Sequence, residues 1–351
     1  MPLSEQTPFR VIRYATALTC LLMLLTGNAT AQNPPQKPPQ PTPPPTSATA
    51  TRTYKMVVFL RGIEFWNWAY AGMHDAARSV GPDIKVELVG PENWDSTREA
   101  ITISDLAEKR VNGILLTAGN SHTLDPAINK AVEAGIPVVT FDSDAPQSKR
   151  LGFIGSNNYS MGLMAGETMA QWLQGLGGAI GVCNNEGTFH LEERLRGFRD
   201  GVEKVAPGTV IHVLDDHGDQ KASERNFKVL LTTHPEIRGL FGTHGEAGPA
   251  AAKAVRDMNL QSKVQILAFD FGKPVLDLIG KGEIRGTVAQ NPYLMGYYGF
   301  LMMYGASNPQ QGATAVPGLY GFSPVPPLID TGSRILGKDD IEQLKRVPLP
   351  E

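Results

Sequence analysis

Polar side chains that could bind a small molecule follow several short apolar runs in this chain. Asp142 comes directly after the run that ends at Phe141, and Asp270 comes directly after the run that ends at Phe269. Carboxylates accept hydrogen bonds, whereas arginine, histidine and amide side chains donate them. The other candidate binding residues are Arg61, Phe65, Trp66, His190, Arg194, His244 and Gln290.

These residue types together suit a sugar as ligand. Each sugar hydroxyl both donates and accepts, and a hydrogen bond to a charged group in a closed site contributes roughly 1.5–3 kcal/mol. The C–H faces of a pyranose ring pack well on aromatic rings such as those of Phe65 and Trp66. We expect Trp68 and Phe271 to belong to the core and not to the site.

Motifs for catalysis and for cofactor binding are absent from the sequence. It contains no Gly-x-Ser-x-Gly elbow, no Walker A loop and no zinc triad. The glycine-rich stretch 175–181 precedes a predicted strand instead of following one, which argues against a dinucleotide loop. We therefore expect a protein that is not an enzyme and has no cofactor, no catalytic residue and no metal ligand.

Two pairs of residues leave other chemistry open. His212 and His217 could suggest a metal site, but their spacing at a strand end makes this a weak signal. Asp142 and Asp270 could resemble the carboxylate pair of a glycosidase, and turnover of an aryl glycoside by the pure protein would favour that interpretation.

Length and charge narrow the class of protein. The chain has 351 residues, more than one core usually holds, so we expect two lobes. Its formal net charge is −3, and it has no large basic block of the kind that a nucleic-acid binder needs to neutralise phosphates. Its two cysteines are Cys20 and Cys183, and we expect no internal disulfide because Cys20 lies in a leader segment.

The first 53 residues predict export and a tether. Arg10 and Arg13 precede an apolar run over residues 15–25, and an Ala-x-Ala sequence ends at Ala31. This pattern is typical of a secretory signal peptide, so we expect residues 1–31 to be removed and the protein to be periplasmic. Residues 32–53 are rich in proline, which indicates an extended, disordered linker.

From residue 55 onward, apolar runs alternate with amphipathic stretches. Alternating strands and helices predict an α/β fold with two doubly wound parallel sheets, in which ligands bind at the carboxyl ends of the strands. Ser96 and Glu99 are spaced as a capping box that opens a helix. The predicted strands are 55–60, 113–117, 137–141, 179–183, 209–213, 239–241, 264–269 and 286–290. The predicted helices are 65–80, 96–109, 124–134, 161–173, 191–205, 222–232, 249–258 and 294–304.

Five sequence strings carry a family resemblance in order and spacing. They are residues 134–146, 154–159, 193–198, 267–270 and 286–292. With them, the chain from residue 54 to about 335 resembles the periplasmic sugar-binding proteins of ABC transporters, of the ribose, galactose and xylose type. These proteins have the type I periplasmic binding protein fold, in which three crossings between the lobes form a hinge.

The resemblance implies roles for the candidate residues. The stacking aromatics match Phe65 and Trp66, the carboxylates match Asp142 and Asp270, and the helix-start pair matches His190 and Arg194. The hinge amide matches Gln290, and Arg61 lies where some members have a basic contact. An amide of the family falls on His244, a polar position falls on Ile63 and a basic position falls on Ser143, so this chain departs from the family at three sites.

The resemblance also implies the domain organisation and the partners. An N-terminal lobe would take residues 54–156 plus 291–322 and a C-terminal lobe residues 157–290 plus 323–351, with crossings near Ser156, Gln290 and Phe322. A monomer of this kind would capture a monosaccharide (a pentose, a hexose or a related polyol) by hinge closure and deliver it to the membrane permease of an ABC importer. The alternative is an exported sensor that presents the sugar to a signalling receptor. A transcription repressor with this fold would need a helix-turn-helix where this chain has its leader.

Overall fold

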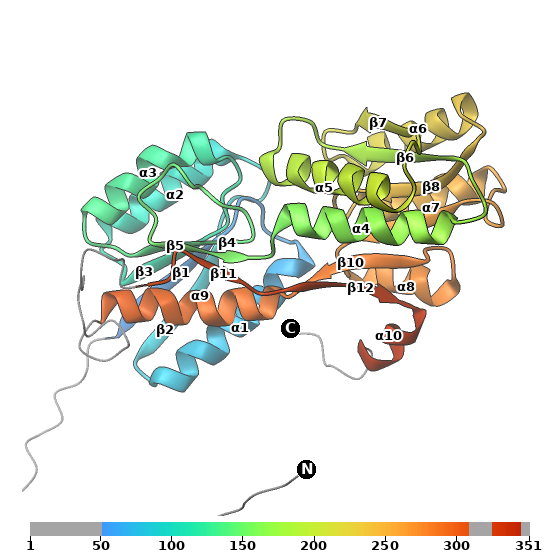
Figure 1. Cartoon of the computed structure of the whole chain (residues 1–351). Coiled ribbons are helices and arrows are strands. Elements are labelled where there is room, and N and C mark those ends of the chain that lie inside the picture. Colours follow the sequence, from blue (N-terminus) through green and yellow to red (C-terminus); the bar gives the residue numbers. More distant parts are fainter. Residues whose placement is uncertain (1–50, 309–324, 345–351) are drawn as a thin grey trace, which may run out of the picture. The chain divides into compact units, whose positions relative to one another are not determined.

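Two six-stranded sheets, each covered by helices on both faces, make up the described part of the chain (Figure 1). The structure is a computed structural model that describes residues 51–308 and 325–344. The strands are β1 (Arg52–Val57), β2 (Ile84–Val89), β3 (Gly113–Leu116), β4 (Val138–Phe141), β5 (Gly152–Gly155), β6 (Ala179–Asn184), β7 (Ile211–Asp215), β8 (Ile237–Gly242), β9 (Gln265–Phe269), β10 (Gly286–Gln290), β11 (Leu328–Asp330) and β12 (Ser333–Gly337).

Ten helices connect or follow these strands in the same described residues. They are α1 (Glu64–Val80), α2 (Ser96–Glu108), α3 (Ser121–Glu133), α4 (Asn158–Leu173), α5 (Phe189–Val205), α6 (Gln220–Thr233), α7 (Ala247–Asp257), α8 (Lys273–Lys281), α9 (Pro292–Ser307) and α10 (Lys338–Leu344). None of the helices in these residues is long and apolar enough to cross a membrane.

The two sheets repeat one topology. The first has the order β11-β5-β4-β3-β1-β2 and the second the order β12-β10-β9-β8-β6-β7, so β6 to β10 occupy the places that β1 to β5 occupy in the first. The pairs are parallel except for β12, which runs antiparallel to β10. This confirms the predicted α/β fold with two doubly wound sheets. In such sheets the strand order reverses beside the first strand, and a crevice opens at the carboxyl ends.

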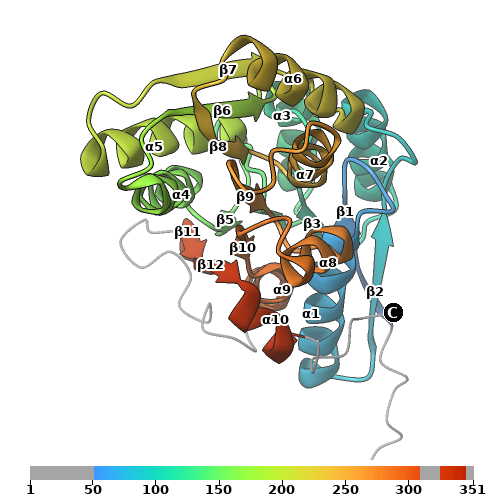
Figure 2. The same ribbon diagram turned by 90° about the vertical axis from the view of Figure 1, so that its right-hand side faces the viewer.

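Alternate residues of each central strand face different helix pairs. In the first sheet, Leu115 packs with α1 and α9 while its neighbours Ile114 and Leu116 pack with α2 and α3. In the second sheet, Leu240 packs with α6 and α7 while Phe241 packs with α4 and α5. Figure 2 shows these two helix pairs on opposite faces of the second sheet. We call the first sheet with α1, α2, α3 and α9 the first lobe, and the second sheet with α4 to α8 and α10 the second lobe.

The chain passes three times between the sheets within residues 51–308 and 325–344. It crosses after β5, after β10 and between β11 and β12. The third crossing lies at Thr331 and Gly332, not near Phe322 as predicted, because β11 pairs with β5 and belongs to the first lobe. Phe322 itself lies outside the described residues. The Ser156 hydroxyl donates to the Gly332 carbonyl at 2.8 Å, so the first and third crossings lie side by side.

Several local predictions need correction. Four strands (β2, β5, β11 and β12) and two helices (α8 and α10) were not predicted, and β1 begins at Arg52, inside the residues expected to form the linker. The remaining linker up to residue 50 and the expected signal peptide at 1–31 lie outside the described residues.

The predicted capping box at the start of α2 is wrong. Asp95 caps the helix instead, since its carboxylate accepts a hydrogen bond from the Arg98 N–H at 2.9 Å. Glu99 turns into the core and accepts from the Gly119 N–H at 3.2 Å. Burial raises the pKa of Glu99 to about 8, although the bond from Gly119 opposes this.

Candidate functional site

Asp142 and Asp270 lie at equivalent places in the two lobes. Asp142 follows β4 and Asp270 follows β9, the fourth strand of each repeat. The Asp142 N–H donates to the Ile154 carbonyl at 3.0 Å, and the Asp270 N–H donates to the Val288 carbonyl at 2.8 Å. Each carboxylate is therefore fixed to the carboxyl edge of its sheet by the neighbouring strand, as the sequence predicts for ligand-binding residues of this fold.

Arg194 supplies the positive charge beside these carboxylates. It lies on α5 and is only 4% exposed. Its Nε donates to the Asn158 side chain at 2.8 Å and its Nη1 donates to the Thr243 carbonyl at 3.0 Å. The guanidinium lies 3.8 Å from the centroid of the Phe269 ring. These contacts fix the orientation of the guanidinium and leave its other N–H groups free to donate to a bound molecule.

The charges of this group influence one another across the two lobes. Burial raises the pKa of Asp142 to about 7; Arg194 lowers it, Asp270 raises it further, and Gln290 and Thr117 lower it. Burial also raises the pKa of Asp270, and Arg194 again opposes the shift. The pKa of Arg194 is lowered by burial against the pull of both carboxylates. The structure therefore brings Asp142, Arg194 and Asp270 together in one electrostatic group.

Gln290 connects the same group to the second crossing. It is the last residue of β10, and its amide Nε2 donates to Asp270 Oδ1 at 3.4 Å. The same amide lowers the pKa of Asp142. One side chain at a crossing between the lobes thus interacts with a carboxylate from each of them.

A cavity of about 680 Å³ opens beside Asp142 and is lined by both lobes. His190, at the start of α5, lines it opposite the first-lobe loops. Surrounding atoms desolvate His190 although part of its surface reaches the cavity, and this lowers its pKa to about 3, with Arg194 and then His244 acting in the same direction. A neutral imidazole offers one donor and one acceptor to a ligand. From the first lobe, Asn120, Asp142 and Ser143 line the same cavity.

A second cavity, of about 340 Å³, opens beside Asp270 and carries the aromatic side chains. Phe65 lines it, as expected for a ligand-facing ring. Trp68 and Phe271 also line it, with ring centroids 6.2 Å apart, so the expectation that both belong to the core is wrong. Trp68 lies two residues after Trp66 on α1, and a helical pattern of aromatic residues does not reveal which of them faces a cleft.

Trp66 and Arg61 are placed differently from Phe65. Trp66 is 3% exposed, its indole N–H donates to the Leu60 carbonyl at 2.9 Å, and its ring packs edge-on against Phe141 at 5.7 Å. It is therefore part of the first-lobe core. Arg61 forms an ion pair with Glu92 and its side chain is 44% exposed.

His244 is held by two carboxylates. Its Nε2 is 2.8 Å from Asp216 Oδ2 and its Nδ1 is 3.1 Å from Glu246 Oε2. Burial lowers the pKa of His244, but the bonds to Asp216 and Glu246 outweigh this and raise it to about 9. Asp216 is fully buried and accepts a further bond from the Ser223 hydroxyl at 2.7 Å. Both ring nitrogens are thus engaged within the second lobe, in an ion-pair group that sequence reasoning missed because Asp216 and Glu246 are ordinary loop residues.

A direct hydrogen bond joins the lobes at the rim of the second cavity. The backbone N–H of Lys273 on α8 donates to Glu64 Oε2 on α1 at 3.0 Å. Glu64 lines the cavity together with Gly272. The site therefore lies between two lobes that contact each other at its rim, and the residues that line it come from both.

Comparisons with known proteins give a consistent result. A family model described as a periplasmic binding protein domain matches residues 54–311. A curated ribose import binding protein of Bacillus subtilis is 27% identical over 226 residues, which is 64% of this chain and 72% of that protein.

Two solved structures resemble this chain over most of its length and over nearly all of their own. A sugar-binding protein of a sugar ABC transporter from Bacillus halodurans has a TM-score of 0.77 at 31% identity, covering 83% of this chain and 99% of that one. An arabinose-binding protein from Geobacillus stearothermophilus has a TM-score of 0.75 at 32% identity, covering 83% and 98%.

Proposed function

The chain belongs to the periplasmic binding protein domain family, and from this premise we propose that it captures a monosaccharide between its lobes and delivers it to an ABC importer. The membership agrees with the resemblance identified in the sequence. One observation carries the proposal: Asp142 of the first lobe shares an electrostatic group with Arg194 and Asp270 of the second. A molecule that hydrogen-bonds to both lobes stabilises the state in which they are together.

The chemistry of the group supports a neutral, hydroxylated ligand. Two carboxylates and one guanidinium carry at most one net negative charge, and they offer both acceptors and donors to hydroxyl groups. Phe65 and Trp68 supply apolar ring faces at the second cavity, on which the C–H face of a sugar can pack. The ribose, arabinose and other sugar names of the relatives point to the same class of ligand.

In this proposal each predicted binding residue except Arg61 has a role. Asp142, Arg194, Asp270, Gln290 and His190 hydrogen-bond to hydroxyls, and Phe65 packs against the ring. Trp66 and His244 act as positioning residues, because the first supports Phe141 and the second is held by Asp216 and Glu246. Arg61 lies outside this group.

The proposal includes two further points: the protein is exported, and it does not alter its ligand chemically. The family consists of binding proteins, and we infer that this chain likewise releases its ligand unchanged. Residues 1–31 would be removed as a signal peptide and the following proline-rich segment would tether the folded part in the periplasm. The lobes would open and close about the three crossings.

A thermal-shift screen of the protein without residues 1–31 tests the proposal. Pentoses, hexoses and inositols are added one at a time, and a true ligand at 100 times its Kd stabilises the protein by about 2.7 kcal/mol. The variant Asp142→Ala/Asp270→Ala is screened in parallel as the matched control. Stabilisation by one sugar in the wild type but not in the double variant supports the proposal. Equal stabilisation of both proteins, or no response to any sugar, contradicts it.

A further inference from the structure

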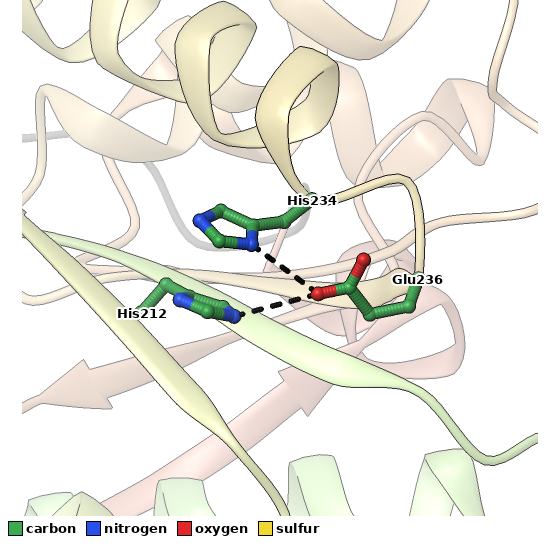
Figure 3. A group of neighbouring side chains, drawn as sticks. All are labelled: His212, His234 and Glu236. Atoms are coloured by element: carbon green, nitrogen blue, oxygen red, sulfur yellow. Dashed lines mark hydrogen bonds and ion pairs between the residues drawn. The ribbon is translucent and has the colours of Figure 1, made fainter.

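Three side chains with metal-binding atoms gather outside the cleft, in the second lobe (Figure 3). His212 lies on β7, His234 is the C-cap residue of α6, and Glu236 directly precedes β8. Their ligand atoms all lie within 4.8 Å of one another. They are at the amino ends of β7 and β8, whereas the cleft residues follow the carboxyl ends of the strands. The cluster is therefore separate from the proposed sugar site.

The spacing of these atoms resembles that of metal ligands. Nδ1 of His234 is 3.3 Å from Glu236 Oε1, and Nε2 of His212 is 3.6 Å from the same oxygen. A tetrahedral Zn²⁺ with bonds of about 2.0–2.1 Å holds its ligand atoms roughly 3.3–3.4 Å apart. The two histidine nitrogens thus lie at nearly the distance from the carboxylate oxygen that two zinc ligands would have.

An unsatisfied atom points to a missing partner in this cluster. Nε2 of His212 is buried and has no hydrogen-bond partner among the residues that the structure describes. A buried polar atom without a partner is unfavourable, and a metal ion would satisfy it. Glu236 supplies a carboxylate, and its Oε1 lies within 4 Å of a nitrogen of each ring.

The two histidine rings are stacked, so a bound metal ion, which must lie in the plane of each imidazole that ligates it, would require them to turn apart. The imidazoles of His212 and His234 have centroids 3.5 Å apart and planes 22° apart.

We propose that His212, His234 and Glu236 form a binding site for a divalent transition-metal ion, for which Zn²⁺ is the best match. Two imidazoles and one carboxylate are ligands that zinc accepts, with a remaining position for water. β7 is the edge strand of the second sheet and pairs only with β6 among the described strands. A bound ion would tie this edge strand to the turn between α6 and β8.

Calorimetric titration of zinc chloride into tag-free, chelator-treated protein tests the site. We expect one zinc ion per chain in the wild type, and a rise in melting temperature that the chelator reverses. His212→Ala and His234→Ala each remove a ligand and should weaken zinc binding more than the roughly 10- to 100-fold typical of losing an outer partner. Binding should also weaken as the pH falls and the histidines are protonated.

His217→Ala is the matched control. His217 is an exposed histidine of the same lobe whose Nδ1 lies 2.8 Å from Asp215 Oδ2, so it would bind zinc if any surface histidine did. Its replacement should leave zinc affinity unchanged, and the melting temperatures of all three variants in chelator confirm that each is folded. Undiminished zinc binding by His212→Ala and His234→Ala, or no zinc binding by the wild type, would overturn the proposal. Neither result depends on whether the cleft binds a sugar.

Discussion

The main chains of Asp142 and Asp270 share the same left-handed conformation, with φ angles of 59° and 61°. Residues with a Cβ atom avoid this region, and aspartate and asparagine tolerate it best because their short side chains can bond locally. The repeated topology thus places the same sharp turn at the end of β4 and of β9. Each turn carries a carboxylate whose charge acts on Arg194 and raises its pKa against the effect of burial.

Replacing either carboxylate should weaken sugar binding without unfolding the protein. Asp142→Ala and Asp270→Ala remove a charged acceptor from a buried group, which should raise Kd by roughly 30- to 1,000-fold, or about 2–4 kcal/mol. Asp142→Asn and Asp270→Asn keep the tolerance for the left-handed backbone and isolate the effect of charge. Isothermal titration with the sugar found by screening measures the change, and Asp105→Ala, an exposed position on α2, is the control. Unchanged affinity in both alanine variants would place the ligand elsewhere.

Sugar affinity should depend on pH through Asp142. Its pKa is about 7, and a ligand whose hydroxyls donate to it binds the ionised form. Below that pH, binding must release a proton, so the affinity should fall as the pH falls, by at most about tenfold per unit. Titrations from about pH 8 down to about pH 5.5 measure this slope, which Asp142→Asn should reduce. A flat wild-type profile would show that the ligand does not bind the carboxylate form.

The ion pair between His244 and Asp216 should stabilise the second lobe in a defined pH range. The folded-state pKa of His244, about 9, lies above its ordinary value, so its contribution is full below roughly pH 6.5 and is lost as the pH rises through about 9. His244→Ala leaves buried Asp216 unpaired and should lower the free energy of unfolding by about 3–5 kcal/mol near neutral pH. Urea unfolding at several pH values measures both effects, with His74→Ala, an exposed histidine, as the control. Equal stability of His244→Ala and wild type would refute the pairing.

Close packing of α4 on α5 should make Gly162 intolerant of a side chain. A Cβ atom there would collide with the Arg194 carbonyl oxygen, so Gly162→Ala must displace α5. We expect a loss of about 1–3 kcal/mol in unfolding free energy from this overpacking, together with weaker sugar binding because Arg194 moves. Gly280→Ala on α8, where a Cβ meets no atom within 4 Å, is the matched control and should be neutral or stabilising. Thermal melts and titrations of the two variants separate these outcomes.

The sequence predicted most of the fold because strands buried on both faces leave a clear apolar signal. β4 and β9 are such strands, and the carboxylates after them were found for that reason. β2 was missed because Val86 is its only buried residue, as expected at an edge, so the strand lacks a buried apolar run. The third crossing was misplaced because it depends on which sheet accepts β11, a long-range pairing with no local signature.

The site was predicted in part for a related reason. A position at the end of a strand identifies a residue that can reach the cleft. It does not show whether that residue's polar atoms already hydrogen-bond to a neighbouring side chain. His244 was predicted at the cleft, yet its ring nitrogens are engaged by Asp216, which follows a different strand, and by Glu246. Trp66 and Trp68 are two tryptophans of the same helix. Trp66 packs against Phe141 in the core whereas Trp68 lines the cavity, and only this tertiary packing distinguishes them.

The placement of β11 and β12 has a consequence for biosynthesis. These two strands lie at residues 328–337, and β11 covers the edge of β5 in the first lobe while β12 covers the edge of β10 in the second. Neither sheet is complete until the last part of the chain has been made, and before then both present an unpaired edge. The two sheets therefore cannot be completed one after the other during synthesis, because both take an edge strand from the same short segment, residues 328–337.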